Sequence, residues 1–237
     1  MSVENIKQFI KNELTGWQRW EIVWLSISVS VIIGLSIYWG DNLRGIIAAV
    51  TGVLYVLITG KGKLSGYLFG LVNALLYGII ALEAKYYGEV MLNLLYYVPM
   101  QIVGWFAWKK NMNSETNEVN KKKLSVKAEL VLFAGSVVAI YIYSLVLKYL
   151  GGNLPLIDSI STCLSVTAMI LSVGRFLEQW ILWFIVDVVT VYMWYVDYVN
   201  GGSDIATLIM WIIYVISAVL MFVKWFRDVS VKNCVDS

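Results

Sequence analysis

Eight apolar stretches, each long enough to cross a membrane as a helix, dominate the sequence. A hydrocarbon core of about 30 Å takes roughly 17–25 helical residues. The stretches are Ile22–Trp39, Leu43–Thr59, Leu64–Leu82, Tyr86–Trp108, Ala128–Leu147, Ile157–Val173, Leu177–Val196 and Ile205–Val223. The pattern predicts an all-α integral membrane protein with eight transmembrane helices, preceded by an amphipathic stretch from Asn5 to Trp20.

The composition agrees with this prediction and excludes other classes of protein. Hydrophobic residues make up 59% of the chain and charged residues 14%, whereas soluble domains are about half apolar and a quarter charged. The chain has no histidine and only two cysteines, so the usual general base and the usual metal-ligand clusters are missing. A nucleotide-binding P-loop is also missing. We therefore expect neither an enzyme nor a resident metal or cofactor.

The positions of the basic residues predict the orientation of the helices. With eight crossings, 15 of the 18 Lys and Arg residues fall on one side, and only Arg44, Lys85 and Lys148 fall on the other. Cytoplasmic loops are rich in Lys and Arg, so both termini and the loop Lys109–Lys127 are expected in the cytoplasm. We interpret the loop lysines as topological anchors that contact anionic head groups. A nucleic-acid patch is the weaker alternative, and no nucleic-acid partner is expected.

A weak internal repeat divides the chain into two similar parts. When Lys61 is aligned with Arg175, Asn73 aligns with Asp187, and a short insertion later brings Trp108 onto Trp225. The repeat predicts two parallel units of three helices joined by a linker helix, a 3+1+3 core with one extra N-terminal helix. The expected segments are 1–42 (tail and extra helix), 43–108 (first unit), 109–149 (loop and linker helix), 150–228 (second unit) and 229–237 (tail).

Asp187 is the most informative polar residue because it lies in the middle of its predicted helix. A carboxylate at the bilayer centre costs roughly 2.5–3.5 kcal/mol, so such residues usually face a cavity or a partner. Helical spacing puts Trp180, Trp183 and Asp187 within an arc of about 60°. Two indoles and a carboxylate on one stripe suit a flat, cationic, aromatic ligand. The structural alternatives are that Asp187 is protonated and bonded to a neighbouring helix, and that Trp180 is an interfacial residue. Seven other tryptophans, Trp108 and Trp225 among them, are assigned to interfacial belts.

Other mid-membrane polar residues lie in the third and fourth predicted helices: Asn73, Asn93, Tyr97 and Gln101. Their amide and phenol groups could bind a carboxamide or a ribose, and hydrogen bonding between helices is an equally weighted alternative. Gly66 and Gly70 are interpreted as a small-residue pair that lets helices approach closely. Pro99 removes a backbone hydrogen bond and predicts a kink or hinge.

Several of these segments resemble the PnuC family of nicotinamide riboside transporters, whose relatives carry thiamine or riboflavin. The similar segments are LFGLVN (Leu68–Asn73), GWFAW (Gly104–Trp108), Asp158–Leu171 and the Trp180–Trp183 pair, and the resemblance covers roughly Leu43 to Asp228. It implies a SWEET-like core, facilitated diffusion with later trapping by a cytoplasmic kinase, and a ligand stacked on Trp180 and Trp183 with Asn73 nearby. The family often has an amide where this chain has Asp187.

The sequence therefore predicts a vitamin uptake carrier in the lipid bilayer, with a small-molecule substrate held at mid-depth between the two units. Nicotinamide riboside is the first candidate, and thiamine or riboflavin is the alternative. Alternating access would come from one unit rocking against the other. Two further hypotheses stay open, a proton-coupled carrier that uses Asp187 and a scaffold protein that transports nothing. The sequence also leaves a homo-oligomer open.

Overall fold

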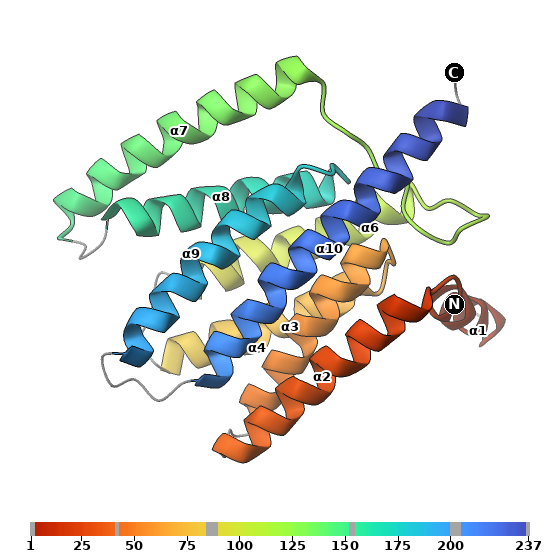
Figure 1. Cartoon of the computed structure of the whole chain (residues 1–237), viewed down its shortest axis with the longest axis horizontal. Coiled ribbons are helices and arrows are strands. Elements are labelled where there is room, and N and C mark those ends of the chain that lie inside the picture. The colour runs from red at the N-terminus through yellow and green to blue at the C-terminus, as the bar shows by residue number, and fades with distance from the viewer. Residues whose placement is uncertain (1–2, 41–42, 84–89, 152–154, 200–204, 236–237) are drawn as a thin grey trace. The chain divides into compact units, whose positions relative to one another are not determined.

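The computed structural model describes residues 3–40, 43–83, 90–151, 155–199 and 205–235, and helices make up most of them (Figure 1). In chain order these are α1 (Val3–Leu14), α2 (Arg19–Trp39), α3 (Leu43–Lys61), α4 (Gly66–Glu83), the π-helix η1 (Met91–Tyr97), α6 (Val98–Lys109), α7 (Val126–Tyr149), α8 (Pro155–Val173), α9 (Gln179–Val199) and α10 (Ile205–Val235). No β-strand occurs within these ranges, where only isolated bridges are found.

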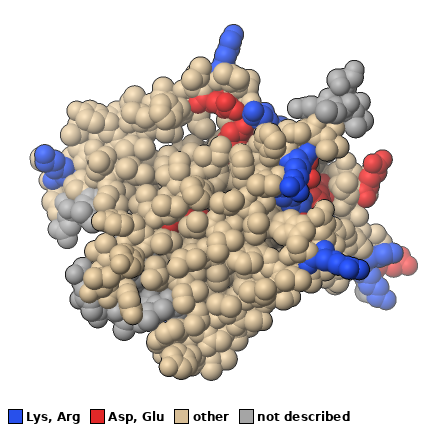
Figure 2. Space-filling model, in the orientation of Figure 1, with Lys and Arg blue, Asp and Glu red and all other residues tan. Residues whose placement is uncertain are grey.

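Each predicted apolar stretch coincides with helical structure, and the fourth coincides with η1 followed by α6. The predicted start of the fourth stretch, Tyr86, lies outside the described residues. Five helices within the described ranges are long and apolar enough to cross a membrane: α2, α3, α7, α8 and α10. Two shorter apolar segments lie in α4 and α9. The face drawn in Figure 2 is largely uncharged, as expected for a surface in contact with lipid.

The largest difference in helix length is at α10, which continues to Val235 although its predicted membrane span ends at Val223. The sequence changes there from apolar to charged, beginning with Lys224. Hydropathy detects that change, but charged residues propagate a helix as well as apolar ones do. The predicted membrane span therefore ends before the helix does.

The chain divides into two compact units, residues 1–120 and 121–237. In unit 1, α3 packs against α2 and α4, and α4 packs against η1 and α6. In unit 2, α8 packs against α7 and α9, and α9 packs against α10 (Figure 1). Each unit thus contains three successive helices in which the middle one contacts both others.

Close helix contacts in unit 1 depend on glycines. A Cβ atom on Gly66 would lie 2.9 Å from the backbone nitrogen of Thr59, and one on Gly70 would lie 2.6 Å from the amide of Gln101. Real Cβ atoms are not found at such distances, so only glycine at position 66 lets α4 approach the α3 backbone this closely, whereas at position 70 the flexible end of the Gln101 side chain would have to move. The predicted role in close helix packing is confirmed for Gly66.

The irregularity predicted at Pro99 takes the form of a π-helix. Pro99 lies in the first turn of α6, directly after η1, and its missing N–H interrupts the helical hydrogen bonds that continue from η1. The preceding seven residues form η1, and the N–H of Val98 donates to the carbonyl of Asn93, five residues back. Such π-turns are often found at functional sites. Here the π-helix brings Asn93 into a buried position.

The turns at the start of α4 and of α9 correct the register of the repeat. They share one pair of backbone hydrogen bonds, Gly62–Thr59 and Lys63–Ile58 in unit 1, and Arg175–Ser172 and Phe176–Leu171 in unit 2. Gly62 and Arg175 both have positive φ, 87° and 66°. The carbonyl of Gly62 also accepts a hydrogen bond from the N–H of Val119 at 2.8 Å, and the carbonyl of Arg175 accepts one from the N–H of Lys122 at 2.9 Å. Gly62, not Lys61, therefore corresponds to Arg175.

This register pairs Tyr67 with Trp180 and Ala74 with Asp187. Tyr67, Trp180, Ala74 and Asp187 are all buried. The predicted alignment of Asn73 with Asp187 is wrong by one residue. Unit 1 has a methyl group where unit 2 has a carboxylate.

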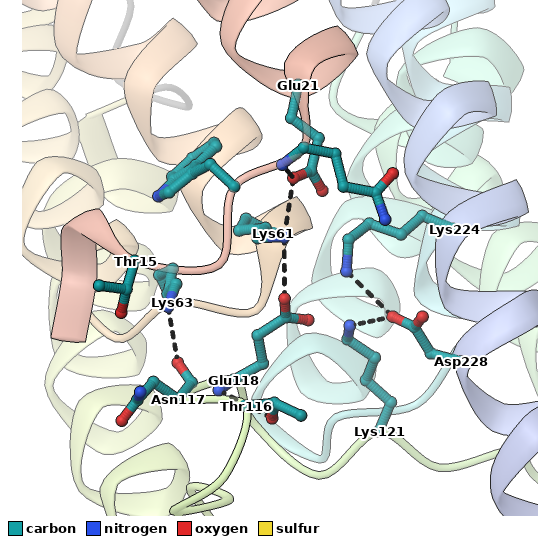
Figure 3. Close-up of polar contacts among 12 residues, drawn as sticks. Thr15, Glu21, Lys61, Lys63, Thr116, Asn117, Glu118, Lys121, Lys224 and Asp228 are labelled. Atoms are coloured by element: carbon teal, nitrogen blue, oxygen red, sulfur yellow. Dashed lines mark hydrogen bonds and ion pairs between the residues drawn. The ribbon is translucent and has the colours of Figure 1, made fainter.

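Charged side chains are buried at one end of unit 1. The ammonium of Lys61 lies 2.7 Å from Glu21 and 2.9 Å from Glu118, so it joins α3 to α2 and to the loop after α6 (Figure 3). The fully buried Lys63 donates to the backbone carbonyls of Asn12 and Asn117. A role in contacting head groups does not apply to these two lysines, because protein atoms surround them.

Unit 2 has its own ion-pair cluster, in which Lys121 and Lys224 both contact Asp228 (Figure 3). The Lys121 side chain is almost completely buried, and its ammonium lies 5.5 Å from the centre of the Trp225 ring. The interpretation of the loop lysines as head-group contacts is therefore wrong for Lys121. Its role is to hold the beginning of unit 2 against α10.

Candidate functional site

The stripe predicted on α9 contains two buried residues and one half-buried residue. Trp180 lies in the first turn and is buried, Trp183 is half-buried one turn later, and Asp187 is 5% exposed. Their spacing along one helix keeps them on one side of α9, since each residue turns by about 100°. The described structure thus presents a carboxylate and two indoles on one helix face within unit 2.

Trp180 is held by a second tryptophan that the sequence did not single out. Its ring makes an edge-to-face contact with Trp225 of α10, with centroids 5.9 Å apart at 75°. Trp225 is completely buried and also faces the ammonium of Lys121. The indole Nε1 of Trp180 is buried and has no hydrogen-bond acceptor within the described residues. Buried indole N–H groups usually have a partner, so this donor is a candidate for a hydrogen bond to a ligand.

Asp187 makes no hydrogen bond or ion pair with any residue that the structure describes. It is buried on α9 beside Val186, and its counterpart in unit 1 is Ala74. Because the same helix position is filled by a methyl group in the other unit, packing alone does not require a carboxylate there. A buried ionisable group without a structural partner is a candidate for binding a charged ligand.

Unit 1 engages its polar residues differently. The Nδ2 of Asn73 donates to the carbonyl of Ala48 at 2.8 Å, which links α4 to α3. The hydrogen bond between helices that was the alternative for Asn73 is therefore present. Asn93 is buried in η1, and the ring of Tyr97 packs against Tyr96 with centroids 5.5 Å apart.

Gln101 lies at a small pocket within unit 1. The pocket has a volume of about 150 Å³ and is lined by residues of α4 and α6: Tyr67, Leu68, Leu71, Gln101, Ile102 and Trp105. Gln101 is buried, and its Oε1 has no donor within the described residues. An unsatisfied amide oxygen in an apolar pocket can accept a hydrogen bond from a ligand. Gly70 makes room for this side chain.

The sequence assigned Trp108 and Trp225 to interfacial belts, and the structure shows that both are completely buried. Trp108 contacts Tyr67 edge-to-face at 5.0 Å and 85°, which repeats the contact of Trp225 with Trp180. Their predicted equivalence in the repeat was the signal that could have identified them, since lipid-facing residues have no reason to pair across a repeat. In unit 1 a tryptophan of α6 therefore holds an aromatic residue of α4, and in unit 2 a tryptophan of α10 holds an aromatic residue of α9.

Comparison with known proteins identifies relatives over nearly the whole chain. Residues 42–227 match the family described as nicotinamide mononucleotide transporter. A protein of Neisseria mucosa named nicotinamide riboside transporter PnuC is 39% identical over 226 residues, which cover 93% of this chain and 86% of the relative. A protein of the same name from Haemophilus influenzae is 30% identical and covers 93% of this chain and 95% of the relative.

The fold is similar to a solved structure titled "Crystal structure of the Vitamin B3 transporter PnuC". The TM-score is 0.84 and the sequence identity is 36%, and the match covers 97% of this chain and 99% of the other. The match therefore includes the N-terminal helices as well as the two repeated units. The coverage shows that this chain and the solved transporter share one architecture from end to end.

Proposed function

We propose that this chain, which belongs to the PnuC transporter family, takes up nicotinamide riboside across a bacterial inner membrane. The family match spans residues 42–227, and two relatives named for nicotinamide riboside cover 93% of the chain. The apolar helices support a multi-pass membrane protein. Both family and fold belong to transporters, so the function is transport and not catalysis.

The single observation that supports the proposed chemistry of binding is the buried, unpaired carboxylate of Asp187. The pyridinium of nicotinamide riboside is a flat cation, and a desolvated carboxylate offsets its charge. The indoles of Trp180 and Trp183 add stacking and cation–π attraction, worth about 0.5–2 kcal/mol each. The free indole N–H of Trp180 can donate to an oxygen of the ligand.

Unit 1 offers polar groups of its own that suit the same ligand. Asn93, Tyr97 and Gln101 offer amide and phenol groups for the carboxamide or the ribose. Gln101 is the strongest of these because its oxygen is buried without a donor. Asn73 is the weakest because its amide already donates to Ala48.

Transport itself is proposed as facilitated diffusion through eight crossings with both termini in the cytoplasm. The 15 basic residues on one side of the predicted topology support this orientation. The sequence has no P-loop that would bind ATP. Net uptake then requires that the substrate be trapped after entry, and phosphorylation by a cytoplasmic kinase would achieve this.

Calorimetric titration of the purified protein with nicotinamide riboside, thiamine and riboflavin tests the proposal. We expect saturable binding that is tightest for nicotinamide riboside. Asp187→Asn should weaken binding of the cation by roughly 1.5–3 kcal/mol, the range for interactions with a charged group. Asp158→Asn, in the first turn of α8, is the matched control and should have little effect.

Three other results would overturn parts of the proposal. Tighter binding of thiamine would change the substrate, and absence of saturable binding would favour a scaffold. An equal loss for neutral riboflavin in Asp187→Asn would refute charge pairing. The buried carboxylate also suits a proton-coupled carrier. Uptake into liposomes distinguishes the two mechanisms, because facilitated diffusion does not respond to an imposed pH gradient.

A further inference from the structure

The short helix α1 exposes an apolar stripe along its whole length. Ile6, Ile10 and Leu14 are 43%, 51% and 74% exposed. They are spaced four residues apart, so with about 100° per residue they lie within an arc of about 80°. The stripe is therefore continuous on one side of the helix, and nothing in the described residues covers it.

The side of α1 next to the stripe is docked on unit 1 by specific contacts. The ring of Phe9 packs on Trp105 with centroids 5.9 Å apart. The carboxylate of Glu13 accepts hydrogen bonds from both the backbone N–H and the hydroxyl of Ser65. Lys63 donates to the carbonyl of Asn12. These contacts fix the rotation of α1, so the exposure of the stripe follows from how the helix is held.

Two lysines border the stripe on its outer side. If Ile6 is placed at zero, Lys7 and Lys11 lie at about 100° and 140°, directly beyond Leu14 at about 80°. Both lysine side chains are exposed. Glu13 is engaged with Ser65, and the exposed Glu4 lies beside Lys11 at about 160°, so this edge of α1 has a net charge of +1. The order around the helix is docked face, apolar stripe and basic edge.

We propose that α1 is an interfacial helix that binds the anionic surface of the bilayer with Ile6, Ile10, Leu14, Lys7 and Lys11. A docked helix with an apolar stripe beside a basic edge matches the way interfacial helices lie in head-group regions. The position in the chain supports the same partner, because α2 begins at Arg19, five residues after α1 ends, and is long and apolar enough to span the membrane. The proposal is independent of the transported substrate.

α1 is thereby connected to the transporting part of the chain. Ser65 lies immediately before α4, and Lys63 lies in the turn between α3 and α4. Both are bound by residues of α1. In this proposal the lipid surface and the start of α4 contact neighbouring sides of one helix.

The test uses single-cysteine variants of the full chain, with Cys163 and Cys234 replaced by serine, in liposomes that contain phosphatidylglycerol. An environment-sensitive fluorophore is attached at Ile10→Cys on the stripe or, as the control, at Gln8→Cys, about 160° away on the same helix. Gln8 is exposed and bonds only within the helix. We expect emission at shorter wavelength and quenching by head-group quenchers at position 10, and an aqueous spectrum at position 8.

The basic edge is tested by varying the fraction of phosphatidylglycerol. Each basic residue near an anionic surface contributes about a fivefold gain in binding, so Lys7→Gln with Lys11→Gln should reduce the lipid-inserted population of the label at position 10 by up to about 25-fold. High salt should have a similar effect. Identical aqueous spectra at positions 8 and 10 would overturn the proposal. A shifted spectrum that lipid quenchers do not affect would also overturn it, because another protein would then cover the stripe.

Discussion

Replacing Lys61 with methionine is expected to destabilise unit 1 strongly. The side chain of Lys61 is 2% exposed and contacts two carboxylates, Glu21 at 2.7 Å and Glu118 at 2.9 Å. The substitution keeps the apolar stem but leaves both acids buried without their cation. Removing one partner of a buried ion pair costs about 3–5 kcal/mol. In a chain of this size, 1 kcal/mol shifts the unfolding midpoint by about 2–4 °C, so the expected decrease is roughly 6–20 °C.

An exposed ion pair in the same unit provides the control. Arg44 contacts Glu83, and their side chains are 56% and 59% exposed. Exposed pairs contribute about 0–1 kcal/mol, so Arg44→Met should lower the midpoint by at most about 4 °C. The measurement is the loss of the monodisperse chromatographic peak after heating in detergent. All variants are heated at one fixed rate, because membrane proteins unfold irreversibly under these conditions and midpoints can be compared only between equal heating protocols.

A second variant separates burial of charge from loss of packing. Glu21→Gln combined with Lys61→Met removes one orphaned charge, so the double variant should be more stable than Lys61→Met alone. Equal midpoints for Lys61→Met and Arg44→Met would refute the conclusion that Lys61 is buried among protein carboxylates. It would then behave as an ordinary surface lysine.

Three further substitutions follow from the site and the packing. Trp183→Ala should weaken nicotinamide riboside binding by about 1–3 kcal/mol if the indole is a stacking surface, as for aromatic stacking on bases, and unchanged affinity in a titration of the folded variant would refute that role. Trp225→Phe should weaken binding more than Trp108→Phe although both remove a buried indole, because only Trp225 contacts Trp180; equal dissociation constants would count against it. Gly66→Ala should destabilise the protein by about 1–3 kcal/mol through overpacking, whereas Gly34→Ala, where nothing lies within 4 Å of the added atom, should be neutral or stabilising by up to about 1 kcal/mol in the same heating assay.

The helices were predictable because membrane-spanning segments carry their signal in composition over about twenty residues. Every predicted stretch coincides with helical structure. Helix ends were less predictable, since α10 continues through a charged segment to Val235 and hydropathy ends where charge begins. The π-helix before Pro99 could be expected only as an irregularity, because a proline specifies a missing hydrogen bond and not the geometry that replaces it.

The buried charges at the end of unit 1 were not predictable from the sequence. The positive-inside rule counts lysines but does not identify their partners, and Glu118 comes from a loop far along the chain from Lys61. The same is true of the contact between Trp225 and Trp180. An apolar pattern shows that a tryptophan is compatible with the membrane, and only packing decides whether it faces lipid or protein.

The one-residue error in the repeat changes the interpretation of the site. In apolar helices neighbouring residues are nearly interchangeable, so an error of one residue in the register is hard to detect from sequence. The pairing of Asn73 with Asp187 was therefore interpreted as a pair of equivalent polar positions. The turn at Gly62 and Arg175 shows instead that Asp187 corresponds to Ala74. In both units a buried tryptophan contacts an aromatic residue, Tyr67 on α4 or Trp180 on α9. Only unit 2 adds a carboxylate on the same helix, that of Asp187 on α9. The shared features are therefore those that packing requires, and the unshared carboxylate is the feature that we propose for recognition of a cationic ligand.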